Sequence, residues 1–320
     1  MKDYKQLFEE LKTEVKAAGL YKRATKRGIL EMFFIILSLV IVFTTIHFWH
    51  PILLGMAFTV IFTRAVFLSH DLLHRQIFKD KTLSRQLTLP FSNLLLGLSA
   101  GWWDWKHNVR HHTYTNCVTK DPDITALNGI FMKIQGDNRV VARFPHLIFW
   151  GALFFMYPAF IIQALYFIIK NKKYDELFLS LLHFPLFYGS LFFLLPTTDA
   201  WITIGTLFLT LSTWLSFGFI TNHLGCEVLS EDQYNKTTWM DLQIKTSRNL
   251  KGKAIVHWFF GGLDTQIEHH LFPKAPRFNL LKVAKITKEF CSKHNINYHE
   301  TSVIGAFIEI DRSIERNRRK

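Results

Sequence analysis

The chain alternates long runs of apolar side chains with short polar and basic segments. An apolar run of about 20 residues can cross the hydrocarbon core of a bilayer as a helix. Such runs lie at about residues 30–47, 51–69, 147–169, 177–195 and 200–221, with a shorter run at about 87–103. The 49% hydrophobic content and the 31 phenylalanines also favour a membrane protein over a soluble domain. The pattern therefore predicts an all-α integral membrane protein.

The ends of the chain differ in composition from these apolar runs. Residues 1–28 mix acidic and basic side chains and predict a cytoplasmic amphipathic segment without a cleavable secretory signal. We expect the membrane domain to cover residues 29–295 and residues 296–320 to form a basic tail. Cys117, Cys226 and Cys291 form no C-x-x-C pair, which fits a reducing, cytoplasm-facing protein.

The net charge of +13 could indicate a nucleic-acid partner. The lysines and arginines, however, stand in short groups beside the apolar runs, where cytoplasmic loops of membrane proteins carry them. We therefore expect a bilayer partner and no nucleic acid, with both termini in the cytoplasm.

Histidines form the most unusual polar pattern of the chain. Residues 70–74 read HDLLH, residues 107–112 read HNVRHH, and a further pair follows at residues 269–270. Residues four apart share one face of a helix, and imidazole is a common ligand of transition metals. One more histidine, His223, directly follows the last apolar run. The candidate ligands are His70, His74, His107, His111, His112, His223, His269 and His270.

Eight imidazoles suffice for two metal ions with about four ligands each and positions left for oxygen or water. A donor set made of nitrogen alone argues against magnesium and calcium, and leaves iron, copper, nickel and zinc open. Metal-bound imidazoles usually donate their second N–H to a carboxylate or a carbonyl. Candidates for this supporting role are Asp71, Asp104 and Glu268, and Asp121 with Asp123. We interpret the remaining histidines as structural: His47, His50, His146, His183, His257, His294 and His299.

A single metal site requires every histidine group to lie on one side of the membrane. The run at 87–103 contains Pro90, Asn93 and Gly97, and we interpret it as an interfacial or re-entrant segment. The run at 147–169 contains Pro158 and precedes a basic loop, so we expect it to be interfacial as well, although hydropathy alone favours a span. Four transmembrane helices then form two hairpins (30–47 with 51–69, and 177–195 with 200–221) below a cytoplasmic helical cap that carries the histidines.

The three histidine motifs, in this order between paired spans, resemble the histidine boxes of the integral-membrane fatty acid desaturases. Gln266, in QIEHH, stands where many relatives have a histidine and resembles the front-end branch, which includes Δ6/Δ5 and linoleoyl-CoA desaturases. The flanking sequences WKHN (105–108), TSRN (246–249) and WFFGGL (258–263) are similar to that branch too, and the resemblance covers roughly residues 30–295.

This resemblance implies a di-iron centre held by the eight histidines, with Asn222 acting through water and Gln266 supporting the site. It implies that O2, activated on reduced iron, removes hydrogen from a lipid- or CoA-linked acyl chain and leaves as water. The product would be a cis double bond on the carboxyl side of an existing one. The sequence contains no haem motif of a fused cytochrome b5 domain, nucleotide fingerprint or iron–sulfur cysteine set. We therefore expect electrons from a separate donor, ferredoxin or cytochrome b5 with its reductase.

Aromatic residues beside the boxes are candidates for lining an acyl tunnel, and interfacial anchoring is an equally good interpretation. These residues are Trp102, Trp103, Trp105, Trp258, Phe259 and Phe260.

Three other functions remain open. A related di-iron membrane hydroxylase or ketolase would share the ligands, although the sequence QIEHHLFP favours desaturation. A metal transporter would place its ligands near the bilayer midplane, whereas these histidines follow the ends of the runs. A non-catalytic lipid-binding relative is the third.

Overall fold

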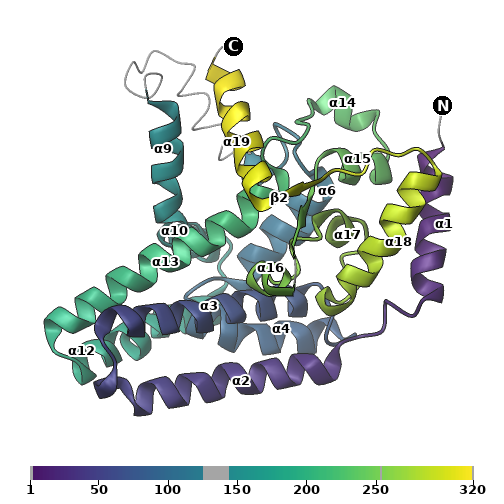
Figure 1. The fold of residues 1–320 in the computed structure, drawn as a ribbon. Helices are drawn as coiled ribbons and strands as arrows, with labels where there is room; N and C mark the ends of the chain where they lie inside the picture. Colours follow the sequence, from purple (N-terminus) through teal and green to yellow (C-terminus); the bar gives the residue numbers. More distant parts are fainter. Residues whose placement is uncertain (1–2, 125–143, 253, 319–320) are drawn as a thin grey trace. The chain divides into compact units, whose positions relative to one another are not determined.

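The computed structural model describes residues 3–124, 144–252 and 254–318, which are mostly helical (Figure 1). They divide into two units. The first unit comprises Met1–Arg23, Lys106–Trp150 and Phe217–Lys320, and the second comprises Ala24–Trp105 and Gly151–Ser216. The predicted helical class is confirmed, with one small parallel sheet added in the first unit.

Five described helical stretches are long and apolar enough to cross a membrane, which bears out the predicted membrane protein. They are Thr25–Thr44 (α2), Pro51–Leu73 (α3), Pro145–Lys170 (α9 to α10), Tyr174–Leu194 (α11 to α12) and Thr197–His223 (α13). Large apolar side chains of α2, such as Phe33 and Phe34, are more than half exposed, as a lipid-facing helix requires.

Helices α3 and α13 pack closely within the second unit. A Cβ atom at Gly55 would lie 2.7 Å from the carbonyl oxygen of Thr203, so a larger residue would separate the two backbones. The hydroxyls of Thr59 and Thr210 lie 2.6 Å apart across the same contact. Small residues and interhelical hydroxyl bonds of this kind are typical of membrane helix pairs.

The apolar run at about 87–103 is not one helix. Helix α4 (Lys81–Leu89) leads into a π-helix, η2 (Pro90–Leu95), and α5 (Ala100–Trp103) follows after a break. Gly97 lies in that break with a positive φ of 67°. The proline and glycine therefore interrupt this run as the sequence predicts.

A buried carboxylate holds the chain after this break. Glu176, in the first turn of α11 (Tyr174–His183), accepts hydrogen bonds from the Ser99 hydroxyl (2.5 Å) and the Gly101 amide (3.0 Å). The Arg85 guanidinium also donates to it, over 2.8 Å. Since a buried charge is stable only when it is paired and hydrogen-bonded, these partners explain how Glu176 can be fully buried.

The stretch 145–170 is also interrupted. Helix α9 (Pro145–Ala152) is followed by the 3₁₀ turn η4 (Leu153–Phe155) and by α10 (Met156–Lys170). Pro158 lies in the first turn of α10, where a proline is tolerated. The stretch is nevertheless one of the five able to span, so its interfacial placement stays a prediction.

The rest of the second unit consists of short segments that join these helices. They are η1 (Ile46–Phe48), η5 (Phe184–Gly189) and α12 (Ser190–Leu194).

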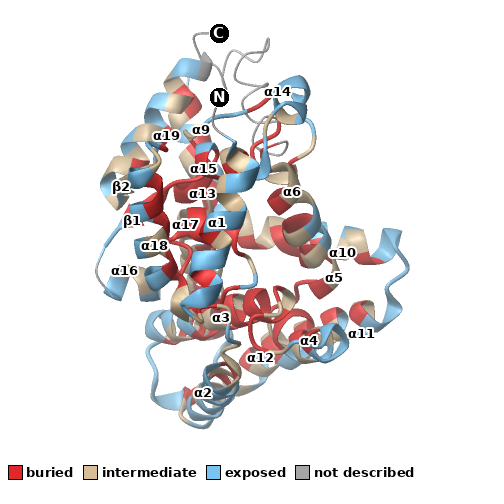
Figure 2. Ribbon diagram, turned by 90° about the vertical axis from the view of Figure 1, so that its right-hand side faces the viewer, coloured by how far each residue is buried: buried red, intermediate tan, exposed pale blue. Residues whose placement is uncertain are grey.

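The first unit is built from shorter helices. Besides the end of α13, it contains α1 (Tyr4–Ala17), most of η3 (Asp104–His111), α6 (His112–Tyr114), most of α9, α14 (Glu231–Asn235), α15 (Trp239–Lys245), α16 (Ala254–Phe259), α17 (Gln266–Leu271), η6 (Arg277–Asn279), α18 (Leu280–Lys293) and α19 (Val303–Arg318). Every residue of α17 is buried (Figure 2).

One apolar core of this unit joins α1 to α15, α17 and α18. Leu11 and Val15 of α1 are fully buried in it. The ring of Phe8 stacks on Phe272, directly after α17, with centroids 5.8 Å apart. The N-terminal segment, predicted to be amphipathic, thus buries its apolar face in a core that also includes Ile267 and Leu271 of α17, the helix that carries two candidate ligands.

The C-terminal segment predicted to be a tail contains regular structure. Strand β2 (Glu300–Ser302) pairs in parallel with β1 (Asn249–Lys251), and Asn249 lies opposite Glu300. Helix α19 follows, and its Ala306 packs in a second small core with Leu250 and Phe260. The proposed domain boundaries at residues 28 and 295 stay predictions.

Candidate metal centre

Six of the eight predicted ligands converge within the first unit. Helices η3 and α6 supply His107, His111 and His112, α13 ends at His223, and α17 supplies His269 and His270. All six are buried. The other two, His70 and His74, belong to the second unit, at the end of α3.

The imidazole nitrogens face one another at short range. The Nε2 atom of His112 lies 3.1 Å from that of His269 and 3.3 Å from that of His107. The Nε2 atoms of His111 and His223 are 3.3 Å apart. Two nitrogens bound to the same ion at about 2.1 Å lie roughly 3 Å from each other. This spacing and the all-nitrogen donor set fit a transition metal.

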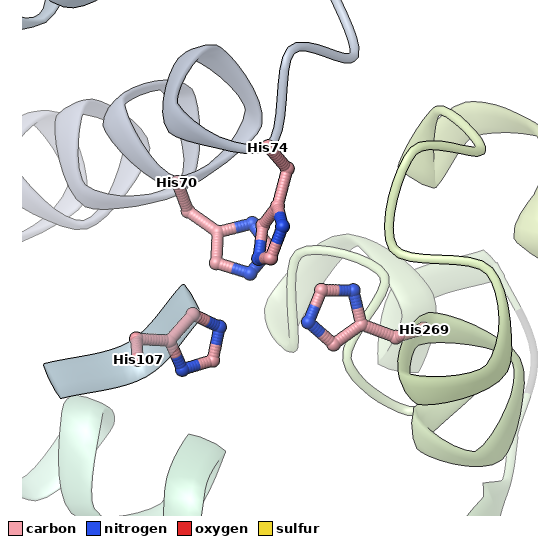
Figure 3. A group of neighbouring side chains, drawn as sticks. All are labelled: His70, His74, His107 and His269. Atoms are coloured by element: carbon pink, nitrogen blue, oxygen red, sulfur yellow. The ribbon is translucent and has the colours of Figure 1, made fainter. Parts of the chain in front are cut away.

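The rings fall into pairs and groups that are compatible with metal binding. Within the first unit, His111, His223 and His270 each offer a nitrogen within 4.8 Å of the others. The rings of His107 and His269 are nearly parallel, with centroids 5.8 Å apart. In the second unit, His70 and His74 extend from the end of α3 with ring centroids 4.5 Å apart (Figure 3).

A π-helix explains why three histidines of one motif can serve one site. Residues Asp104–His111 form η3, whose hydrogen bonds join residues five apart instead of four. This wider turn brings His112, five residues after His107, onto the same helix face as His107, and the two Nε2 atoms lie 3.3 Å apart. In a regular α-helix His112 would point well away from His107.

His111 is held by a buried carboxylate. Its Nδ1 atom donates to Asp121 (3.0 Å), which is fully buried, and lies 3.5 Å from Asp123. Lys106 pairs with Asp123. Burial alone would lower the pKa of His111, but the charges of Asp121 and Asp123 outweigh it and raise that pKa above its usual value. The pair that the sequence offered as a candidate therefore lies at His111.

His223 is oriented by the residues of two other segments. Its Nδ1 atom donates to the Thr246 carbonyl (2.9 Å), and the side-chain nitrogen of Gln266 lies 2.8 Å from its Nε2 atom. The Asn222 amide donates to Gln266 (3.3 Å). Asn222 and Gln266, both predicted to support the site, are thus in contact with each other, and Gln266 touches His223.

His270 is held by Gln243 and Thr115, which sequence reasoning missed. Its Nδ1 atom lies 2.9 Å from Oε1 of Gln243 and 3.2 Å from the Thr115 hydroxyl. The Gln243 amide also donates to the His112 carbonyl (3.0 Å). No motif marks Gln243, which stands in an ordinary amphipathic stretch.

The remaining predicted supports lie as follows. Glu268 is buried and accepts hydrogen bonds from Asn249 (2.7 Å) and Tyr298 (3.0 Å), and burial raises its pKa to about 7. Asp71 lies beside His70, with 3.4 Å between Oδ1 and Nδ1. Asp104 is partly exposed at the start of η3.

The six aromatic residues predicted to line a tunnel have different surroundings. In the second unit, Trp102 and Trp103 are buried against Phe160, with ring centroids 5.3 and 6.0 Å away. Trp105 and Trp258 are each 44% exposed, as interfacial anchors would be. The last two lie in the first unit, where Phe260 is buried in the small core beside β1 and Phe259 packs against that core.

A family model and the relatives found by sequence comparison all indicate the same family. The family model described as "Fatty acid desaturase" matches residues 23–302. The chain is 31% identical over 259 residues to an acyl-lipid (9-3)-desaturase of Physcomitrium patens, which covers 76% of this chain and 48% of that protein. It is 29% identical over 334 positions to the Delta(5) fatty acid desaturase fat-4 of Caenorhabditis elegans, covering 95% and 72%. A Delta(8)-fatty-acid desaturase of Borago officinalis is 26% identical, again covering 95% and 72%. The chain thus spans about half the length of the Physcomitrium patens relative.

Proposed function

Because the chain belongs to the fatty acid desaturase family, we propose that it is an O2-dependent desaturase that introduces a cis double bond into a lipid- or CoA-linked acyl chain. The observation that carries this proposal is the convergence of six buried imidazoles from three separate segments of the first unit. A solvated polar surface would leave such rings exposed, and an apolar core would not gather six of them.

Two iron ions are the cofactor that we propose. The residues that would hold them are His107, His111, His112, His223, His269 and His270, together with His70 and His74 of α3. Bound iron would supply O2 activation and removal of hydrogen from an unactivated methylene, chemistry that amino-acid side chains do not provide.

The chain's own contribution is to fix the orientation of three of these imidazoles. His111, His223 and His270 have Nδ1 directed at a carboxylate, a carbonyl and an amide oxygen, respectively. Since these oxygens accept a hydrogen bond, Nδ1 carries the proton and Nε2 presents its lone pair. Three ligands are thereby set as Nε2 donors by Asp121, Thr246 and Gln243.

The regiochemistry that we propose is that of the front-end branch, with the new double bond on the carboxyl side of an existing one. The support is Gln266 in the third motif and the activities that the relatives' names state, Delta(5), Delta(8) and (9-3). We further propose that a separate ferredoxin, or cytochrome b5 with its reductase, supplies the electrons.

We also propose the four-span arrangement of two hairpins, with both termini and the metal centre on the cytoplasmic side. The interruption of 87–103 at Pro90 and Gly97 supports it, as does the 3₁₀ turn that divides 145–170. Both features suit segments that lie at the interface rather than straight spans.

The test is the fatty acid profile of cells that express the chain with a reductase system. The cells are fed saturated, monoene and diene acids, and mass spectrometry locates the double bonds. We expect a new unsaturated acid that is absent with His111→Ala. A hydroxylated product would assign the chain to the related hydroxylases, and no product from an iron-loaded chain with either donor would contradict the proposal.

A further inference from the structure

Helix α17 is too short to fix its own orientation. It has six residues, lacks a side-chain hydrogen bond at its N-cap, and carries His269 and His270. Isolated helices of this length are not stable in water, so the direction of both imidazoles depends on what holds α17 from outside.

The C-terminal segment supplies one such contact. Within β1, Asn249 accepts a hydrogen bond from the Ile267 amide (2.9 Å) and donates to Glu268 (2.7 Å). The Tyr298 hydroxyl donates to the other oxygen of Glu268 (3.0 Å). The backbone N–H of Asn249 also donates to the His299 carbonyl (3.0 Å). This bond holds the neighbouring residue Tyr298 beside Glu268.

The same segment is also linked, through Arg248, to the end of α13, where His223 lies. The carbonyls in the last turn of a helix lack intrahelical partners. The guanidinium of Arg248, which is fully buried, donates to the carbonyls of Thr221 (2.6 Å) and Leu224 on either side of His223. Arg248 also forms an ion pair with Glu309 of α19.

The charge of Glu309 is what allows Arg248 to be buried at this position. A buried guanidinium without a counter-charge is strongly unfavourable, so removal of Glu309 would favour withdrawal of Arg248 from the two carbonyls. Helix α19 also approaches the turn after α13 directly. A Cβ atom at Gly225, whose φ is +88°, would lie 3.0 Å from the Glu309 carbonyl oxygen.

We propose that Tyr298 and Glu309 are positioning residues for the metal centre. Tyr298 acts through Glu268 on the helix that carries His269 and His270, and Glu309 acts through Arg248 on the turn that carries His223. The segment after residue 295 is therefore part of the metal site, although it contributes no ligand. This inference rests on the proposed function, because it assumes that these histidines bind iron.

The experiment compares Tyr298→Phe and Glu309→Gln with wild type in the purified, iron-loaded full chain. Each variant keeps the size of its side chain and removes a hydroxyl or a charge. The matched control for Tyr298→Phe is Tyr166→Phe, at a 63% exposed tyrosine of α10. The matched control for Glu309→Gln is Glu300→Gln in the same C-terminal segment, where Glu300 forms a surface ion pair with Lys288 of α18. Iron per chain is measured against the concentration of a competing chelator, well below the melting temperature.

We expect both variants to release iron at chelator concentrations at least about 10-fold lower than those that wild type requires. The reason is that residues that orient metal ligands affect metal affinity about 10- to 100-fold. The controls should match wild type. The absorption spectrum of the Co²⁺-loaded chain, which reports ligand geometry, should shift in the two variants alone.

The inference is overturned if both variants retain iron and the Co²⁺ spectrum as wild type does, even when their melting temperatures fall. If Glu309→Gln does not fold, Tyr298→Phe decides the matter, since it removes a single oxygen atom. A wild-type chain that binds no iron would overturn the proposed function itself, which separates that failure from a failure of the inference.

Discussion

Replacement of Glu176 by glutamine is expected to destabilise the second unit far more than replacement of its neighbour Asp175 by asparagine. Both carboxylates accept a hydrogen bond from the same nitrogen of Arg85, each over 2.8 Å. The Glu176 side chain is 1% exposed, whereas that of Asp175 is 55% exposed. The two substitutions therefore differ mainly in burial.

The magnitude follows from the partners of Glu176. A glutamine keeps the shape but has one acceptor oxygen, so it cannot serve Arg85 on one side and both Ser99 and Gly101 on the other. A hydrogen bond to a charged group contributes about 1.5–3 kcal/mol, and a buried ion pair that loses one partner costs about 3–5 kcal/mol. Because Arg85 is itself 39% exposed, we expect about 3 kcal/mol for Glu176→Gln, at the lower end of that range.

The exposed pair should contribute little. Double-mutant cycles on exposed ion pairs give about 0.2–1 kcal/mol, and Asp175→Asn should fall in that range. The measurement is the free energy of unfolding of each purified variant in detergent, by denaturant titration. Equal losses for the two variants, or a loss below about 1 kcal/mol for Glu176→Gln, would refute the argument from burial.

Three further substitutions test the packing. Gly97→Ala should lower the free energy of unfolding by at least about 2 kcal/mol, since φ is +67° and the new Cβ would lie 2.7 Å from the His183 ring. Gly151→Ala, with nothing within 4 Å, should be neutral or slightly stabilising in the same titration, and equal effects would contradict the strain argument. Leu11→Ala should cost about 2–5 kcal/mol if α1 belongs to the core of the first unit, and a loss below 1 kcal/mol in urea titration would contradict it.

The candidate ligands could be predicted because their spacing is a local property of the sequence. His107, His111 and His112 lie within six residues, and such clusters are visible without knowledge of the fold. Gln243 could not be found in this way. It reaches His270 from 27 residues away and Thr115 from 128 residues away, and a glutamine in a short amphipathic helix has no feature that separates it from a surface residue.

The helical elements show the same limit of prediction: features set by local residues can be predicted from the sequence, and features set by contacts of the folded chain cannot. Pro90 and Gly97 predict an interruption of the apolar run at 87–103, because each restricts or frees the backbone locally. The π-helix over Asp104–His111 has no comparable sequence mark, since its turn is set by the contacts of the folded chain.

The basic composition of the C-terminal end did not indicate helix α19, which the structure shows there. The arginines suggest a tail, yet Ala306, Ile310 and Ile314 recur at every fourth position and are buried. That period predicts a helix with an apolar face, and the sequence alone could have revealed α19.

The orientation of the imidazoles distinguishes the candidate metal centre from a structural histidine. His183, in α11, donates from Nδ1 to the Leu94 carbonyl (3.1 Å), and its ring stacks on Phe187 with centroids 5.8 Å apart. Aromatic packing of this kind accounts for a buried neutral ring. At the candidate metal centre, by contrast, the Nε2 atoms of His111 and His223 face each other at 3.3 Å, while Asp121 and Thr246 accept hydrogen bonds from the two Nδ1 atoms. A metal ion between the two Nε2 atoms would accept a lone pair from each ring, in place of the Gln266 N–H that lies 2.8 Å from Nε2 of His223. Convergent Nε2 atoms of this kind favour a metal site over a core of structural histidines.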